Sequence, residues 1–138
     1  MFNILAFLTP KSETLYLDSD STIRQTLESF DYYKYSVVPL LDEEGKYITT
    51  ISEGDILRYI KNDAYFDIRI AESVKVEQIE KYRPYKALTI FSSAEEVIKL
   101  SLEQNFIPII DGRGAYIGII KRRSIIDFLV KNTNLDLK

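Results

Sequence analysis

The stretch PLLDEEGKYITTISEGDI, residues 39–56, decides the fold, because residues 108–125 repeat it as PIIDGRGAYIGIIKRRSI. At an offset of 69 positions, the identical pairs are Pro39 and Pro108, Asp42 and Asp111, Gly45 and Gly114, Tyr47 and Tyr116, Ile48 and Ile117, Ile51 and Ile120, and Ile56 and Ile125. Agreement at one fixed offset marks an internal repeat. The chain is therefore predicted to contain two copies of one small structural unit.

Each copy has the pattern of a β-α-β-β-α unit. In the first copy, the apolar run 37–41, the turn 42–45 and the β-rich run 46–51 predict a hairpin. Cap residues and apolar spacing predict a helix over about 22–33, and a second helix is expected to begin near Ser52. In the second copy, the expected strands are 87–91, 106–110 and 115–120, and the expected helices are about 93–104 and 122–131.

These elements predict an α+β fold in one compact tandem module. The first motif is expected to span residues 1–61, with a short extended candidate at 14–17, and the second motif residues 83–138. The connecting segment, 62–82, contains enough apolar residues to predict an ordered segment with a short helix.

The composition limits the classes of function. The chain has 138 residues, no His, no Cys and a formal net charge of −3. These absences exclude thiolate chemistry and remove the commonest general base and metal ligand. The negative net charge gives no overall attraction to nucleic acid or anionic membranes, so neither is expected as a partner. The ten tyrosines and seven phenylalanines do not interleave with basic residues, so we expect them in cores and interfaces.

The opening segment, residues 1–8, is apolar but too short to cross a bilayer. It also lacks the basic start and the small-residue cleavage site of a signal peptide. A cytoplasmic location is therefore expected.

The phrases VPLLDEEGKYITTISEGDIL (38–57) and IPIIDGRGAYIGIIKRRSII (107–126) each resemble a cystathionine-β-synthase (CBS) motif. The resemblance covers roughly residues 1–131 and implies a free-standing tandem pair, or Bateman module. It implies two motifs packed in pseudo-twofold symmetry through their sheets, with two clefts. In that family such clefts commonly bind AMP, ADP, ATP, S-adenosylmethionine or cyclic di-AMP, so the resemblance implies an adenine nucleotide (AMP, ADP, ATP or cyclic di-AMP) as the ligand. It also implies a homodimer.

The family's nucleotide signature is a Ser or Thr after the third strand, then two residues, then an Asp at the start of the next helix. Here Ser52, Glu53, Gly54 and Asp55 match it. A helix N-terminus offers unpaired N–H groups and a positive dipole end, which suit phosphate. A carboxylate can accept hydrogen bonds from both hydroxyls of a ribose. The resemblance therefore implies a ligand site at this helix start.

The same four residues allow another interpretation. Ser-x-x-Asp before an apolar run also resembles a capping box, with Asp where Glu or Gln is usual. Gly54 favours binding, because a glycine in the first helical turn costs up to ~1 kcal/mol relative to Ala unless something must approach the backbone. The spacing alone leaves both interpretations open.

The second copy departs from the signature. Lys121 and Ser124 stand where the first copy has its hydroxyl and its carboxylate, so the group that would hold a ribose is missing. Arg122 and Arg123 complete a basic cluster that opposes the dipole of the expected helix. An anionic ligand would compensate for this, since Lys and Arg both suit phosphate. A solvated basic patch is the alternative. In family pairs, phosphates held by one motif often reach the other.

The resemblance also implies walls for the adenine base. The residues that it implies beside the base are Ser36, Val38, Pro39, Phe106, Ile107 and Pro108. Both prolines lack an N–H and cannot donate to a neighbouring strand, which leaves the adjacent backbone open to an adenine edge. Thr14 is a further candidate wall by resemblance.

Three classes of function are open to such a chain. The expected one is a regulatory adenine-nucleotide sensor without catalysis, whose state an unidentified effector protein reads. The alternative is a structural or interaction pair that dimerises without bound nucleotide, which the missing acid in the second copy favours in part. An enzyme is not expected, because the sequence has no His, no Cys, no phosphate-binding glycine loop and no evident metal cluster.

Overall fold

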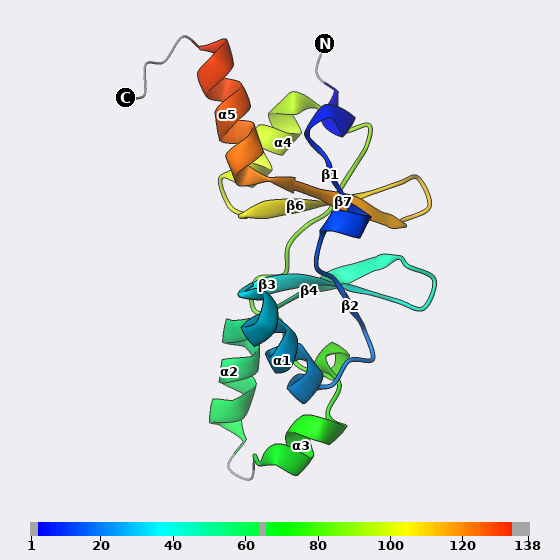
Figure 1. The fold of residues 1–138 in the computed structure, drawn as a ribbon, viewed down its shortest axis with the longest axis vertical. Coiled ribbons are helices and arrows are strands. Elements are labelled where there is room, and N and C mark those ends of the chain that lie inside the picture. The colour runs from blue at the N-terminus through cyan, green and yellow to red at the C-terminus, as the bar shows by residue number, and fades with distance from the viewer. Residues whose placement is uncertain (1–2, 64–65, 134–138) are drawn as a thin grey trace. The chain divides into compact units, whose positions relative to one another are not determined.

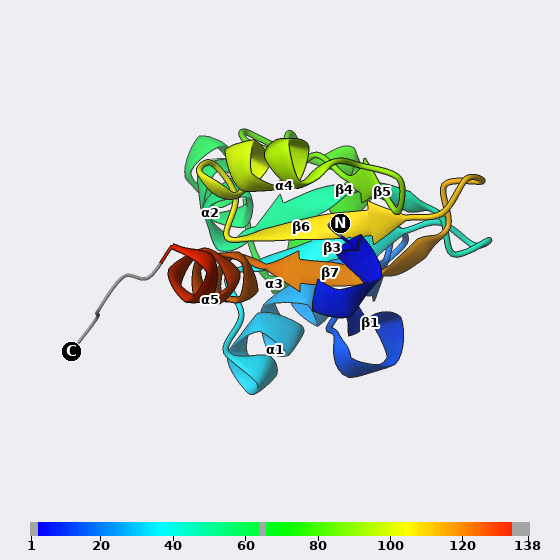
Figure 2. The same ribbon diagram turned by 90° about the horizontal axis from the view of Figure 1, so that it is seen from above.

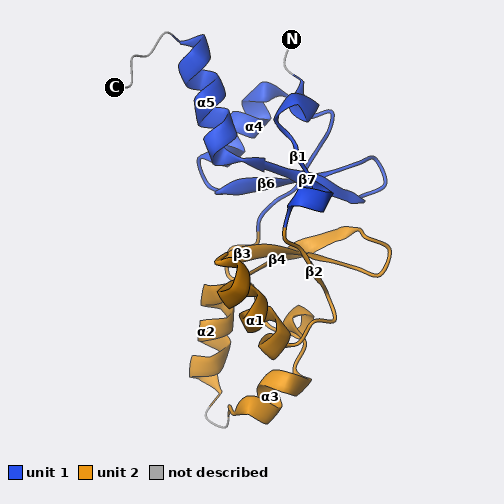
Figure 3. Ribbon diagram, in the orientation of Figure 1, with its two compact units in different colours: residues 1–14, 85–138 blue, residues 15–84 orange. Residues whose placement is uncertain are grey.

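The chain divides into two compact units, each with its own sheet and core (Figure 3). The structure is a computed structural model that describes residues 3–63 and 66–133. Unit 1 consists of residues 1–14 and 85–138, and unit 2 of residues 15–84. The expected first motif began at residue 1, whereas unit 2 begins at Leu15. Unit 2 is thus an insertion in the sequence of unit 1.

Unit 2 is a three-stranded sheet covered on one face by helices (Figure 1). Its strands are β2 (Leu17–Asp18), β3 (Val37–Leu41) and β4 (Tyr47–Ser52), in the order β2-β3-β4. Its helices are α1 (Ile23–Tyr33), α2 (Glu53–Asn62), α3 (Ile68–Ser73) and a 3-10 turn, Val76–Gln78. β2 is parallel to β3, and β3 and β4 form the predicted antiparallel hairpin. The short helix expected in the connecting segment corresponds to α3, and residues 64–65 of that segment lie outside the described residues.

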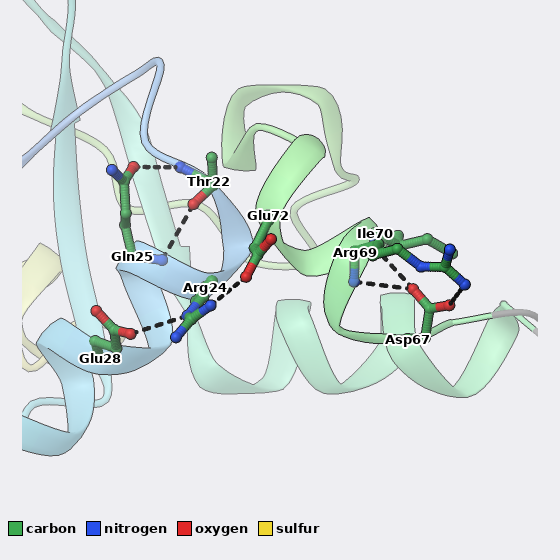
Figure 4. A network of polar contacts seen from close by, with 8 residues as sticks. All are labelled: Thr22, Arg24, Gln25, Glu28, Asp67, Arg69, Ile70 and Glu72. Carbon is green, nitrogen blue, oxygen red and sulfur yellow. Dashed lines mark hydrogen bonds and ion pairs between the residues drawn. The ribbon is translucent and has the colours of Figure 1, made fainter.

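Polar side chains cap the start of helix α1 and pair it with α3 (Figure 4). Thr22 and Gln25 form a capping box, in which each side chain accepts a hydrogen bond from the other residue's backbone N–H. Arg24 forms ion pairs with Glu28 on the same helix and with Glu72 on α3. The apolar side of α1 contributes to the core of unit 2, whose buried residues are Ile23, Phe30, Val38, Leu40, Ile51, Ile56, Ala71, Val76 and Ile79.

Unit 1 is a four-stranded sheet in the order β1-β7-β6-β5. Its elements are β1 (Thr9–Pro10), β5 (Leu88–Thr89), β6 (Phe106–Ile110), β7 (Tyr116–Lys121), α4 (Ala94–Ser101), α5 (Arg122–Asn132) and the 3-10 helices Ile4–Phe7 and Lys11–Glu13. Figure 2 shows β6 and β7 side by side, with β1 along β7. The buried core residues are Ile4, Val97, Ile107, Ile109, Ile120 and Ile125.

The two hairpin turns are built alike, which explains their identical residues. The carboxylate of Asp111 accepts hydrogen bonds from the backbone N–H groups two and four residues later, and Asp42 does the same. These bonds stabilise the charged form and lower the pKa of Asp111. Gly45 and Gly114 close the turns with φ of 81° and 87°, a conformation that favours glycine.

Strand β1 joins unit 1 through a close approach to β7. Pro10 lies opposite Gly118, whose φ of 150° is accessible to glycine. A Cβ at Gly118 would overlap the carbonyl oxygen of Thr9. The equivalent position in the first copy is Thr49, and the described part of unit 2 has no strand on that side of β4.

Two predicted elements are shorter in the structure. The strand expected over 87–91 is only Leu88–Thr89, and the helix expected over 93–104 ends at Ser101. The buried side chain of Gln104 gives the reason. It accepts a hydrogen bond from the N–H of Lys86 and donates to the carbonyls of Lys86 and Phe106, which requires the chain to leave the helix first.

Candidate functional site

The start of α2 is closed by a capping box. The Ser52 hydroxyl accepts a hydrogen bond from the N–H of Asp55 (3.1 Å), and Asp55 Oδ2 accepts one from the N–H of Ser52 (2.9 Å). The capping interpretation of these residues is therefore confirmed. Asp55 is only 4% exposed, so its carboxylate is part of the interior of unit 2. Its role in binding stays a prediction.

The other oxygen of this carboxylate has two donors. Asp55 Oδ1 accepts a hydrogen bond from Arg58 Nη2 and one from the backbone N–H of Tyr82, each at 2.9 Å. The Arg58 guanidinium also lies over the Tyr82 ring, 4.5 Å from its centroid. Tyr82 comes from the segment that leads toward unit 1, so Asp55 ties this segment to the start of α2.

A second cation lies near this carboxylate. Lys81 Nζ donates hydrogen bonds to the carbonyls of Val76 (2.7 Å) and Glu77 (2.9 Å). Burial lowers the pKa of Lys81, and the negative charges of Asp55 and Glu77 act in the opposite direction. A buried carboxylate is costly unless it is paired with positive charge. Arg58 and Lys81 together provide that charge beside Asp55.

A cavity of about 260 Å³ opens beside these groups. Its lining residues are Asp55, Arg58, Tyr59, Asn62, Glu80 and Tyr82. Ligand pockets typically have volumes of about 300–1,000 Å³, so this cavity suits a sugar-sized group better than a whole nucleotide. A larger depression of about 670 Å³ follows α1, but its rim carries Asp18, Asp20 and Glu28. That acidic rim disfavours an anionic ligand.

The structure brings the start of β3 to the start of α2. The carbonyl of Ser36 accepts a hydrogen bond from the N–H of Glu53 (2.9 Å). Val38 and Pro39 are buried, so their side chains belong to the core and only their backbone could face a ligand. Gly54 has room above it, since an added Cβ would meet its nearest neighbours at 3.7 Å.

The start of α5 in unit 1 has a different chemistry. Lys121 occupies the N-cap position and makes no side-chain cap. Arg122 turns back, and its Nε donates to the carbonyl of Ser101 at 2.7 Å. Lys121 and Arg123 are exposed, and Ser124 is half-buried. Over the described ranges 3–63 and 66–133, none of the three cations forms an ion pair.

The remaining predicted residues also lie in unit 1. The Phe106 ring packs edge-on against Tyr85, with centroids 4.9 Å apart. Ile107 and Pro108 are buried, and the Thr14 hydroxyl lies 2.8 Å from that of Tyr116. The predicted site residues therefore form one set in unit 2 and another in unit 1.

Sequence reasoning missed Arg58 and Tyr82. Arg58 could have been found, because a cation three residues after Asp55 lies on the same helical face. Tyr82 gave no signal, because it reaches the carboxylate through its backbone N–H, a group that almost every residue carries.

No group of three or more His, Cys, Asp or Glu among the described residues could hold a metal ion. None of the helices that the structure describes has the length and apolar character needed to cross a membrane.

With the fold and site in view, the family is clear. A sequence model of the CBS domain matches residues 8–62 and again residues 76–131. The chain belongs to the CBS domain family and contains two copies of the domain. The resemblance drawn from the repeated phrases and the α+β fold class are both confirmed.

Solved structures with the same fold include a protein of unknown function and two complexes with nucleotides. A CBS domain-containing protein of unknown function from Bacillus anthracis is 23% identical with a TM-score of 0.81, and the match covers 96% of this chain and 95% of that one. CbpB from Listeria monocytogenes in complex with c-di-AMP is 20% identical with a TM-score of 0.83, and the match covers 96% of this chain and 98% of that one. CBSX2 in complex with AMP is 19% identical with a TM-score of 0.75, and the match again covers 96% of this chain and 98% of that one. No curated protein sequence matches the chain.

Proposed function

We propose that this chain is a regulatory module that binds an adenine nucleotide (AMP, ADP, ATP or cyclic di-AMP) and performs no catalysis. The observation that carries the proposal is Asp55, a carboxylate at a helix start that borders a sugar-sized cavity. Proteins of the same fold were solved with c-di-AMP and with AMP, which supports the ligand class. In this proposal Asp55 and Ser52 hold a ribose, and the positive end of the α2 dipole attracts phosphate.

The other predicted residues complete the proposal. The backbone at Ser36 and Pro39 would receive the base, next to the start of α2 to which Ser36 is hydrogen-bonded. In unit 1, the exposed cations Lys121 and Arg123 are the candidate phosphate contacts. Because Ser124 replaces the acid of the signature, the ribose would be held by the first copy.

The experiment is a titration of AMP, ATP and cyclic di-AMP by calorimetry and thermal shift. A ligand that binds only the folded state raises the melting temperature. In Asp55→Ala the free energy of nucleotide binding should become less favourable by roughly 1.5–3 kcal/mol, the range for hydrogen bonds to charged groups. Asp67→Ala is the matched control, because Asp67 also caps a helix of unit 2 and pairs with an arginine, but does not line the cavity. Equal affinity in wild type and Asp55→Ala would remove Asp55 from the site.

The partners that we propose are a second copy of the chain and an effector protein in the cytoplasm. Leu57 on α2 and Ile126 on α5 occupy equivalent positions in the two copies and are 57% and 50% exposed. Exposed apolar side chains at repeated positions are consistent with a homodimer.

A structural pair without nucleotide is the second candidate. It is favoured by the Asp55 carboxylate, whose two oxygens already accept three hydrogen bonds from the protein. No thermal shift with any nucleotide, together with dimers by light scattering, would favour this candidate.

A further inference from the structure

The connector that leads from unit 2 to unit 1 is bonded at both ends. On the unit 2 side, the N–H of Tyr82 donates to Asp55 Oδ1. On the unit 1 side, the Tyr85 hydroxyl accepts from the N–H of Asn105, and the N–H of Lys86 donates to Gln104. Only residues 83–84 lie between these two anchors. The length of free chain between the units therefore depends on whether Asp55 holds Tyr82.

The acceptor capacity of Asp55 is nearly used. A carboxylate offers about four lone-pair positions. Ser52 N–H occupies one on Oδ2, and Arg58 and Tyr82 N–H occupy both on Oδ1. About one position is left, whereas the two hydroxyls of a ribose need two. A ribose diol can therefore bind this carboxylate only if one of the present donors leaves.

The three donors differ in strength and in freedom to move. The bond from Arg58 is charge-assisted and therefore stronger than a bond from a neutral amide. The bond from Ser52 N–H belongs to the capping box that begins α2. The bond from Tyr82 is neutral, and Tyr82 is 64% exposed. Tyr82 is therefore the donor that is lost at the lowest cost.

We infer that Tyr82 and a ligand's ribose diol compete for Asp55 Oδ1, so that binding of the diol releases the connector from unit 2. The ligand half of this inference rests on the proposed function. The inference assigns Tyr82 a positioning role. Without ligand, the N–H of Tyr82 holds the Asp55 carboxylate in place, and when ligand binds, its release frees the chain between the units. A free diol is the chemical feature that triggers the release.

The first test needs no ligand. Amide hydrogen exchange at Tyr82 is measured in wild type, in Asp55→Ala and in Asp67→Ala, whose carboxylate caps α3 instead (Figure 4). We expect exchange about tenfold faster in Asp55→Ala, the equivalent of one lost hydrogen bond. We expect no change in Asp67→Ala. Unchanged exchange at Tyr82 in Asp55→Ala would overturn the anchor.

The second test uses AMP and 2′,3′-dideoxy-AMP, which lacks the diol, on the wild-type chain. We expect AMP to speed exchange at residues 79–84 while protecting the start of α2, and we expect the dideoxy analogue not to speed exchange at 79–84. AMP that binds and leaves 79–84 unchanged or more protected would overturn the competition. If AMP does not bind, the competition fails for AMP, whereas the proposed function is decided by the titrations with ATP and cyclic di-AMP, and the first test still decides the anchor.

Discussion

At the scale of single residues, Asp55 serves the fold before it serves any ligand. Its carboxylate begins a helix, pairs with Arg58 and receives the N–H of Tyr82. A buried carboxylate without such partners would be costly. A residue at the centre of these contacts can serve both the fold and a ligand, because the neutral donor from Tyr82 can be exchanged for a ligand hydroxyl.

Gly54 allows the two roles to be separated. Its added Cβ would find ordinary contacts at 3.7 Å, and Ala is favoured over Gly within a helix. We therefore expect Gly54→Ala to raise the free energy of unfolding by up to ~1 kcal/mol, measured by urea denaturation. If a nucleotide approaches this backbone, the same variant should bind it at least several-fold more weakly by calorimetry.

The matched control is Gly112→Ala, because a Cβ there meets nothing within 4 Å. It should leave nucleotide affinity unchanged. A Gly54→Ala protein that is more stable and binds as well as wild type would show that no ligand approaches the first turn of α2.

At the scale of elements, the two copies differ in what lies along their hairpins. In unit 1, β1 pairs with β7, and Gly118 permits the close approach. In unit 2, the equivalent strand β4 carries Thr49, and none of the described residues of unit 2 forms a strand on that side. The glycine at this repeat position in unit 1 thus leaves the room that β1 occupies beside β7.

Gly118→Ala should weaken the attachment of β1. The added methyl group would overlap the carbonyl of Thr9, so we expect a loss of about 1–3 kcal/mol in the free energy of unfolding, the range for overpacking. Amide hydrogen exchange at Leu8 and Thr9 should accelerate more than in β6. The control is Thr49→Ala, at the equivalent position of the first copy. Its free energy of unfolding, measured by urea denaturation, should remain within about 0.5 kcal/mol of that of wild type. Equal stability of the two variants would contradict this account.

The sequence predicts the hairpins and four of the helices because their signals are local. The turn at Asp42–Gly45, the capping residues and the apolar spacing all lie within the elements that they define. The pairing of β1 with β7 could not be predicted, because a strand of two residues has no periodicity and its partner is more than a hundred residues away. Tyr82 escaped for the same reason, since a backbone donor carries no sequence signal.

At the scale of the whole molecule, the two units differ in continuity. All nine buried residues of the unit 2 core lie between Ile23 and Ile79 in one uninterrupted segment. The core of unit 1 needs Ile4 from the start of the chain, and Phe7 packs edge-on against Phe128, with centroids 5.1 Å apart. Unit 2 can therefore complete its core from local sequence, and unit 1 cannot.

Fragments should reproduce this difference. We expect a fragment of residues 15–84 to unfold cooperatively on heating, because it contains its complete core. Circular dichroism measures this unfolding. Residues 85–138 should be unstable or should aggregate, because β7 lacks β1 and the core lacks Ile4. A peptide of residues 1–14 should bind this second fragment by calorimetry and raise its melting temperature. A second fragment that is equally stable without the peptide would contradict the prediction.

The crossing of the chain between units also governs how the protein responds to mechanical force. Both ends of the described chain, Asn3 and Thr133, belong to unit 1. Tension applied between them loads the contacts of the N-terminal segment within unit 1, which include the β1–β7 pairing and the Phe7–Phe128 contact, before it reaches the inserted residues 15–84. Unit 1 thereby shields unit 2, which contains Asp55, from a force applied to the ends of the chain.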